Sequence, residues 1–176
     1  MKATSLMAAA VIGLGSGAAL ADISIDFEDF AATGGSFYQV GDTTVEGTLA
    51  QAIGDFYLVA EGGNWTYADD LTVLFVDGDG NFVLQIGGWS TYAETKLSWE
   101  YGGSQDAGTE GGGTVDVNMD VSGMTMYMGN GYSSGTESTW TGNITLTGID
   151  FTAIPAPGAL ALLGLAGIAG TRRRRG

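Results

Sequence analysis

The sequence contains neither cysteine nor histidine. Their absence excludes thiolate and imidazole metal ligands, disulfide bonds, and catalysis by Ser-His-Asp or Cys-His groups. Basic residues are nearly absent between positions 22 and 153, where Lys96 stands against all 20 acidic residues and the net charge is −19. A surface of this charge has no basic face for a phosphate backbone, so we expect no nucleic acid among the partners.

The first 21 residues have the pattern of a secretory signal peptide. Lys2 precedes an apolar run at 6–14, and small residues follow as far as Ala19-Leu20-Ala21. Signal peptidase accepts only small side chains at two positions before the cleaved bond, and Ala19 and Ala21 provide them. We therefore expect export, with residues 1–21 removed and a mature chain that begins at Asp22.

An uncharged segment followed by four arginines lies at the other end of the sequence. Residues 154–170 carry no charge, and their 17 positions reach the lower limit of about 17–25 for a bilayer span. A helix over about 157–171 would cross most of a hydrocarbon core of about 30 Å, and arginine side chains extend its reach. The cluster Arg172, Arg173, Arg174 and Arg175 would stay in the cytoplasm. The sequence thus predicts a membrane anchor that holds residues 22–153 outside, with a buried C-terminal helix as the alternative.

This tail also resembles a known sorting signal. The motif Pro155, Ala156, Pro157 and Gly158, the apolar helix and the terminal arginines occur in the order of the PEP-CTERM signal of Gram-negative-type bacteria. In that family a membrane transpeptidase, exosortase, is thought to process the signal and send the protein to the cell surface or an exopolysaccharide matrix. The family's central Glu is Ala156 here. The resemblance covers residues 154–176 and implies nothing about the rest of the chain.

Residues 22–153 have the composition and pattern of a β-protein. They hold 23 of the 31 glycines and no proline, and Thr, Val, Ile and aromatic residues are abundant. Apolar and polar residues alternate at 23–27, 95–101 and 115–121, as expected for strands buried on one face. The runs 71–76 and 82–86 are apolar on nearly both faces, which indicates central strands. We expect one all-β domain of nine or ten strands, a two-sheet β-sandwich of jelly-roll type.

Smaller features refine this expectation. The apolar alternation slips at Gly148, where a β-bulge would restore the inward direction. The stripe at 124–128, with methionine at every second position, is typical of core filling. Glycine-rich segments at 102–113 and 129–135 are expected to be loops, and the junction at 153–157 is the only linker-like stretch.

One acidic, glycine-rich segment is a candidate metal site. Asp77, Asp79 and Asn81 place oxygen side chains at alternate positions, as calcium ligands require. An EF-hand is excluded, because Phe82 and Gly88 stand where that loop needs Gly and Glu. The alternative is a hairpin turn between the two central strands, since Asp, Gly and Asn favour such turns.

Aromatic residues flanked by small polar ones suggest a second kind of site. Sugar-binding sandwiches stack pyranose rings on such side chains, so Trp65, Trp89 and Trp140 are candidates for glycan stacking. Tryptophan is also a large core residue, and Trp99 lies on an apolar strand face. The stacking hypothesis therefore depends on which indoles are exposed.

These observations support three hypotheses about function. The first is a non-enzymatic structural protein, exported to the bacterial envelope or matrix. The second is a calcium-assisted carbohydrate-binding module for exopolysaccharide. The third is a glycoside hydrolase or lyase, which needs only two carboxylates at a defined separation. Acidic residues cluster at 26–29 and at Asp69-Asp70, but 20 acidic residues make such pairs easy to find by chance. We expect no cofactor and no enzymatic activity.

Overall fold

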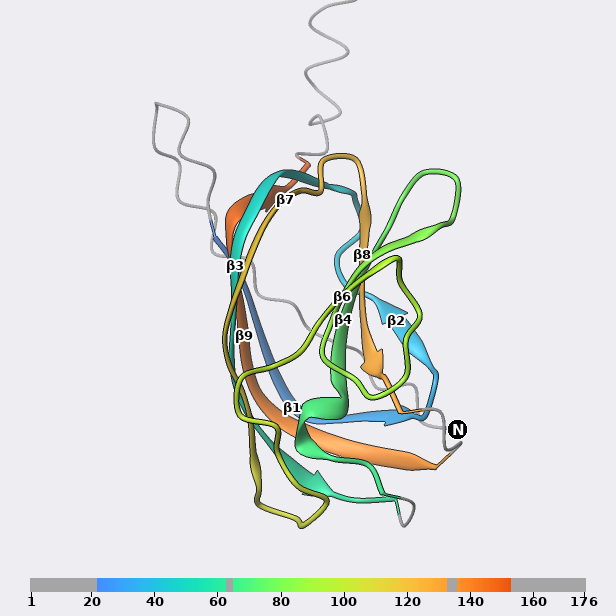
Figure 1. The fold of residues 1–176 in the computed structure, drawn as a ribbon, viewed down its shortest axis with the longest axis vertical. Coiled ribbons are helices and arrows are strands. Elements are labelled where there is room, and N and C mark those ends of the chain that lie inside the picture. The colour runs from blue at the N-terminus through green and yellow to red at the C-terminus, as the bar shows by residue number, and fades with distance from the viewer. Residues whose placement is uncertain (1–21, 63–64, 133–135, 153–176) are drawn as a thin grey trace, which may run out of the picture.

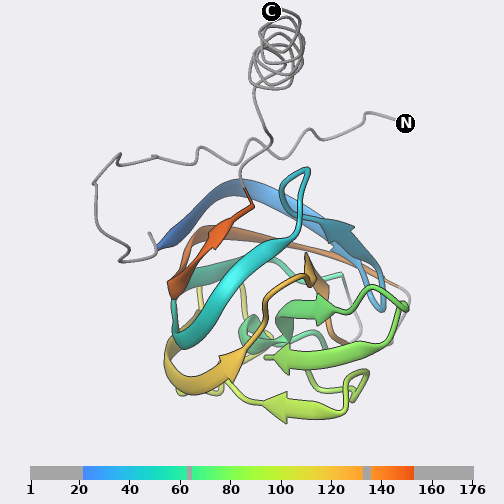
Figure 2. The same cartoon turned by 90° about the horizontal axis from the view of Figure 1, so that it is seen from above.

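The computed structural model describes residues 22–62, 65–132 and 136–152. The expected signal peptide, the proline motif, the apolar helix and the arginine cluster lie outside these residues. Among the described residues, no helix has both the length and the apolar character needed to cross a bilayer. What is described is a sandwich of two β-sheets packed face to face (Figures 1 and 2), as expected from the sequence.

The first sheet has four long antiparallel strands in the order β1-β9-β3-β7. Its members are β1 (Ile23–Thr33), β9 (Glu137–Phe151), β3 (Val45–Ala60) and β7 (Glu110–Asp120). The sheet bends along its length so that its inner face curves around the second sheet (Figure 1).

The second sheet has five shorter strands in the order β2-β8-β4-β5-β6. They are β2 (Phe37–Gln39), β8 (Thr125–Asn130), β4 (Leu71–Val76), β5 (Phe82–Ile86) and β6 (Thr95–Leu97). All neighbours are antiparallel except β5 and β6, which run parallel. One short 3₁₀ helix, η1 (Ala68–Asp70), leads directly into β4.

The strand pairs are nested along the chain. β1 pairs with β9, β2 with β8, β3 with β7, and β4 with β5, all antiparallel. The chain is therefore a long two-stranded ribbon whose tip is the turn between β4 and β5. Rolling the ribbon brings β9 beside β3 and β8 beside β4, and the short strand β6, which lies beside β5, completes the second sheet.

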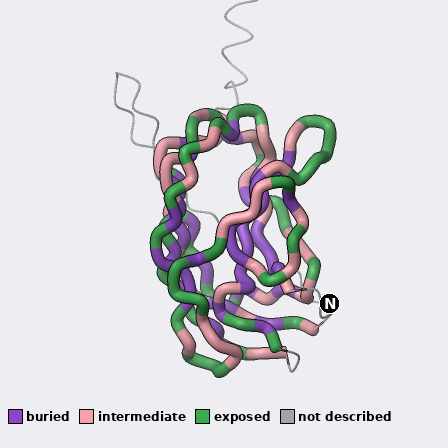
Figure 3. Tube along the Cα trace, in the orientation of Figure 1, coloured by how far each residue is buried: buried purple, intermediate pink, exposed green. Residues whose placement is uncertain are grey.

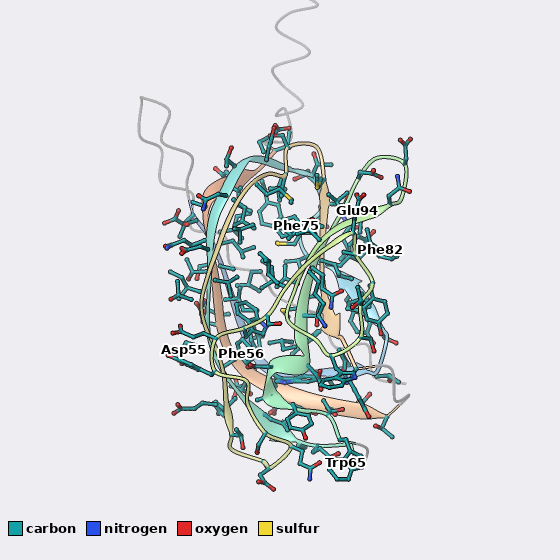
Figure 4. The ribbon with its side chains drawn as sticks, in the orientation of Figure 1. Asp55, Phe56, Trp65, Phe75, Phe82 and Glu94 are labelled. Carbon is teal, nitrogen blue, oxygen red and sulfur yellow. The ribbon has the colours of Figure 1, made fainter. Side chains whose placement is uncertain are left out.

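Buried residues lie on strands of both sheets (Figure 3), and their apolar side chains form one core between the sheets. Every second side chain from Ile23 to Phe27 is buried, as the alternation predicts, and β4 is buried at all of its positions, as its apolar run predicts. Phe56 and Phe75 point into the core from opposite sheets, whereas Asp55 points outward (Figure 4). The expected methionine stripe fills core volume, since Met126 and Met128 on β8 are fully buried.

The expected bulge occurs at Gly148. Ile149 pairs with Gly47, but the next pair along β9 joins Thr147 to Gln51, so three residues of β3 lie opposite Gly148 alone. Gly148 adopts a φ of +82°, which glycine tolerates without strain. Because the register shifts here, Ile149 returns to the core face and is fully buried.

Three expectations about loops and strands are wrong in part. Residues 110–113 begin strand β7 and are not part of a loop, and residues 129–130 complete β8. The glycines permit this because β7 approaches β3 closely: a Cβ at Gly112 would collide with the backbone of Gly54. The strand expected at 95–101 ends at Leu97, since the backbone N–H groups of Glu100 and Tyr101 both turn to the carbonyl of Gly112.

Candidate functional site

A cavity of about 300 Å³ lies where three chain segments meet at one end of the five-stranded sheet. β4 begins there, and β5 and the parallel strand β6 end there. The three segments are η1 with the residue before it, the turn after β5, and the turn after β6. The lining residues are Tyr67, Asp69, Asp70, Gly87, Gly88, Trp89, Ser98, Trp99 and Gly102.

Asp70 fixes two of the three aromatic residues of the cavity, Tyr67 and Trp89, relative to each other. Its side chain is 3% exposed, and its two oxygens accept the backbone N–H of Tyr67 at 2.7 Å and that of Trp89 at 2.8 Å. Burial raises the pKa of the Asp70 carboxyl, while these two N–H groups and the Lys96 ammonium oppose the rise and Asp69 adds to it. Both oxygens are thus used within the protein, which makes Asp70 a positioning residue.

The turn that carries Trp89 is held by further polar side chains. The buried amide of Gln85 donates to the carbonyls of Gly87 and Ser90, at 2.8 and 2.7 Å, and accepts the N–H of Tyr92 at 2.8 Å. Lys96 Nζ donates to the carbonyl of Trp89 at 2.6 Å. Even so, the Trp89 side chain is 75% exposed. The result is an exposed indole on a backbone that is fixed on both sides.

Asp69 is the carboxylate with spare acceptor capacity. Its Oδ1 accepts the N–H of Gly112 at 2.9 Å, whereas Oδ2 is buried and has no hydrogen-bond partner among the described residues. Burial raises the pKa of Asp69, and the backbone N–H groups of Gly112 and Gly102 reduce the rise. Because Asp69 also lines the cavity, a ligand donor that reached Oδ2 would remove the cost of a buried oxygen without a hydrogen bond.

Trp99 closes the inner end of the cavity. It is nearly buried, donates its indole N–H to the carbonyl of Leu71 at 2.7 Å, and packs edge-on against Phe56 at 5.5 Å. Gly87 lies against it with a φ of +82°, and a Cβ at this glycine would collide with both the Trp99 indole and the Leu71 carbonyl. Only glycine fits this wall without a change in structure.

The structure separates the three candidate stacking residues. Trp89 and Trp65 are 75% and 63% exposed, and Trp65 lies at the end of the molecule where β4 begins (Figure 4). Trp140 is fully buried, so its assignment to glycan stacking is wrong. Its indole N–H donates to the carbonyl of Ala68 at 3.0 Å, and it therefore supports η1 from the core.

The turn between β4 and β5 uses the candidate calcium ligands for itself. Asp77 Oδ1 accepts the N–H groups of Asp79 and Asn81, at 2.9 and 2.8 Å, and Oδ2 accepts the Asn81 amide at 2.9 Å. The Asn81 amide, followed by these N–H groups, lowers the pKa of Asp77. The described residues include no group of three acidic side chains placed to hold a metal. A hairpin turn accounts for this segment.

Sequence reasoning found part of the cavity. It singled out Trp89 and the pair Asp69-Asp70, but it assigned no role to Lys96 or Gln85. The remaining acidic cluster, at 26–29, does not line the cavity, and Asp26 instead accepts the Asn143 amide at 2.8 Å. The contacts that hold the turn at Trp89 come from three separate elements, η1, β5 and β6, which no local pattern reveals.

Comparison with protein-family models, with curated proteins and with solved structures finds no match to this chain. The description of the protein therefore rests on its fold and its cavity. They describe an acidic β-sandwich with an exposed, rigidly held indole beside a carboxylate-lined cavity.

Proposed function

We propose that this protein is exported to the bacterial envelope and that its sandwich domain binds polysaccharide at the cavity beside Trp89. The observation that carries the proposal is the exposed Trp89 indole on a backbone fixed by Asp70, Gln85 and Lys96. An exposed tryptophan loses solvent contact when a sugar ring stacks on it. Holding its backbone in place before binding reduces the entropy lost on binding.

The chemistry of the cavity suits a sugar ring. Trp89 and Tyr67 offer apolar surface for the C–H face of a pyranose, and Asp69 and Ser98 offer polar atoms for its hydroxyl groups. The cavity of about 300 Å³ lies at the lower end of the range for small-ligand sites. This combination favours one or two sugar units of a chain.

We further propose that the fold is a jelly roll. The nested strand pairs and the rolled ribbon support this assignment, since a jelly roll is a double-sheet sandwich of eight strands in two Greek keys. The short strand β6 is an addition at one edge. The cavity then lies at an end of the sandwich, where the connecting segments are free to vary without altering the core.

The signals expected at the two ends of the sequence support delivery to the cell surface, where such a domain would meet polysaccharide. The signal peptide ending at Ala21 would export the chain, and the helix before Arg172 would anchor it. The PEP-CTERM resemblance at 155–158 implies exosortase as a further partner and the cell surface or matrix as a destination. A purely structural role in the envelope is the alternative that the same signals allow.

A glycan array tests the binding function directly. Wild-type protein is expected to bind at least one class of glycan on the array, and Trp89→Ala is expected to lose this binding. Trp65→Ala tests whether the second exposed indole contributes, and Asp55→Asn on the outer face of β3 serves as the control. An array that stays empty for wild-type protein would contradict the binding function and favour the structural role.

Cell fractionation tests the route of delivery. The account predicts the protein in the membrane or surface fraction, and an intact chain found only in the cytoplasm would contradict it. Mass spectrometry of surface-extracted protein tests processing by exosortase. Recovery of the peptide containing Arg172–Arg175 in full amount would show that the tail is not cleaved.

The geometry does not favour the calcium-assisted or hydrolytic alternatives. The oxygens of Asp77 are engaged within their own turn. In the cavity, Asp70 has both oxygens bound to backbone N–H groups. A glycosidase needs two carboxyl groups that both face the scissile bond, and here only Asp69 has acceptor capacity to spare.

A further inference from the structure

The cavity beside Trp89 pairs aromatic surface with a carboxylate that has no cation of its own. We propose that it binds a sugar carrying a protonated amino group, with the ammonium donating to Asp69 and the sugar ring lying against Trp89. The inference rests on the proposed function and specifies its ligand as an amino sugar of the glucosamine type.

The two carboxylates of the cavity differ in their capacity to accept a hydrogen bond from a ligand. Asp70 directs its oxygens to the backbone of Tyr67 and Trp89, so it has little left for a ligand. Asp69 Oδ1 accepts the N–H of Gly112, whereas Asp69 Oδ2 is buried and has no donor within hydrogen-bond distance among the described residues. A carboxylate with an unused oxygen binds an ammonium more strongly than a hydroxyl, since the donor is charged.

The charge of Asp69 has no partner cation in the cavity as described. Lys96 is the only basic residue within the described part of the chain, and its Nζ donates to the carbonyl of Trp89. Its charge lowers the pKa of Asp70. A neutral sugar would leave the half-buried Asp69 carboxylate uncompensated. An ammonium supplies the missing charge, and a uronate would be repelled by the cavity and by the −19 charge of residues 22–153.

Trp89 and Tyr67 provide aromatic surface in the cavity. The Trp89 indole is three-quarters exposed, and the Tyr67 ring is partly exposed at the same cavity. An indole face attracts cations as well as apolar C–H groups, because its π-electrons give it a negative face. An amino sugar offers both features on one ring. Trp89 and Asp69 can therefore recognise the same sugar unit.

Isothermal titration of the full-length protein tests the inference, in a detergent without a sugar headgroup. The ligands are hexamers of glucosamine, of N-acetylglucosamine and of glucose. The glucosamine hexamer is expected to bind about tenfold or more tightly than the other two, which is the effect of one added charge-assisted hydrogen bond. Its affinity is expected to fall as salt is raised.

Two variants locate the effect. Asp69→Asn preserves shape and removes the charge, and it is expected to lower affinity for the glucosamine hexamer to that for the N-acetylated hexamer. Asp55→Asn removes the same charge on the outer face of β3 and is expected to change affinity less than about twofold. Should Asp69→Asn fail to fold, the comparison of the glucosamine hexamer with hexalysine on wild-type protein still tests the assignment to a sugar.

Hexalysine serves as a control ligand that carries ammonium groups but no sugar ring. Binding of hexalysine as tight as that of the glucosamine hexamer would overturn the assignment to a sugar. Equal affinity for the acetylated and deacetylated hexamers would overturn the inference and leave the proposed function in place. If no hexamer bound and the glycan array were empty, both would fail.

Discussion

Trp89 donates its backbone N–H to Asp70 Oδ1 over 2.8 Å while its indole remains 75% exposed. A nearly buried carboxylate thus fixes the position of one of the most exposed aromatic residues in the described structure. Burial of a carboxylate is costly unless its oxygens accept hydrogen bonds, and Asp70 meets this requirement with two backbone N–H groups. The arrangement stabilises the shape of the cavity.

Asp70→Ala is expected to reduce the free energy of unfolding by about 2–4 kcal/mol, because it leaves two N–H groups without their acceptor. Asp70→Asn keeps one acceptor and is expected to cost less than the alanine variant. Urea denaturation measures both changes. The exposed control Asp55→Ala is expected to stay within about 0.5 kcal/mol of wild type. Equal stability of Asp70→Ala and wild type would show that Asp70 does not hold the cavity.

The pH dependence of the free energy of unfolding is expected to show the raised pKa of the Asp69 carboxyl. Its pKa in the folded state is raised above 3.8 by burial, so folding favours the protonated form. Its contribution to stability is therefore present at low pH and is lost as the pH rises from 3.8 through the raised pKa. We expect the stability of Asp69→Asn relative to wild type to increase across this window and to be constant above it.

Asp120 provides a control of opposite sign for that experiment. Hydrogen bonds from Ser122 lower its pKa, so its contribution is present above 3.8 and is lost as the pH falls through the folded-state pKa. The relative stability of Asp120→Asn is therefore expected to improve only below pH 3.8. Identical pH profiles for the two variants would contradict the assigned environments. Both profiles come from denaturant titrations at a series of pH values.

Gly87→Ala is expected to destabilise the protein by about 2–5 kcal/mol, because it combines a left-handed backbone conformation with overpacking. The added Cβ would collide with the hydrogen-bonded pair of Trp99 and the Leu71 carbonyl. Gly78→Ala, in the turn between β4 and β5, adds a Cβ that meets no atom within 4 Å and serves as the matched control. Thermal unfolding followed by circular dichroism compares the two. Similar losses in both variants would show that Gly87 is not confined.

Substitution of a buried tryptophan is expected to reduce the free energy of unfolding much more than substitution of an exposed one. Trp140→Ala removes a fully buried indole and its hydrogen bond to Ala68, and should cost about 3–5 kcal/mol. Trp65→Ala removes an exposed side chain and should change stability by no more than about 0.5 kcal/mol. Urea denaturation of the two variants checks this difference. A large loss in Trp65→Ala would mean that this residue supports the fold and is not free for a ligand.

Much of the sandwich could be predicted from local patterns. A strand buried on one face alternates apolar and polar residues, and the segment beginning at Ile23 does so in the sequence and in the structure. The buried run from Leu71 to Val76 predicted a strand covered on both faces. The glycines at 111–113 led to the wrong prediction of a loop. A strand that approaches its neighbour closely also requires glycine, as β7 does where it lies against β3.

The site could be predicted only in part. Trp65, Trp89 and Trp140 have similar small and polar neighbours, so local sequence does not distinguish them. Trp140 is buried because it lies on the central strand β9, opposite Leu58 of β3. The burial of Trp140 thus depends on pairing between strands that are far apart in the sequence. The contacts that define the cavity are equally distant, since Asp69 accepts a hydrogen bond from Gly112, 43 positions further along the chain.

The central claim, that a sugar binds beside Trp89, is tested most directly by nuclear magnetic resonance of the indole N–H groups. The four tryptophans give four signals, and Trp89→Phe identifies one of them. Titration uses the hexamers of glucosamine, N-acetylglucosamine and glucose. The account predicts that the Trp89 signal moves with at least one hexamer while those of the buried Trp99 and Trp140 stay in place. A Trp89 signal that remains still with all three would contradict it.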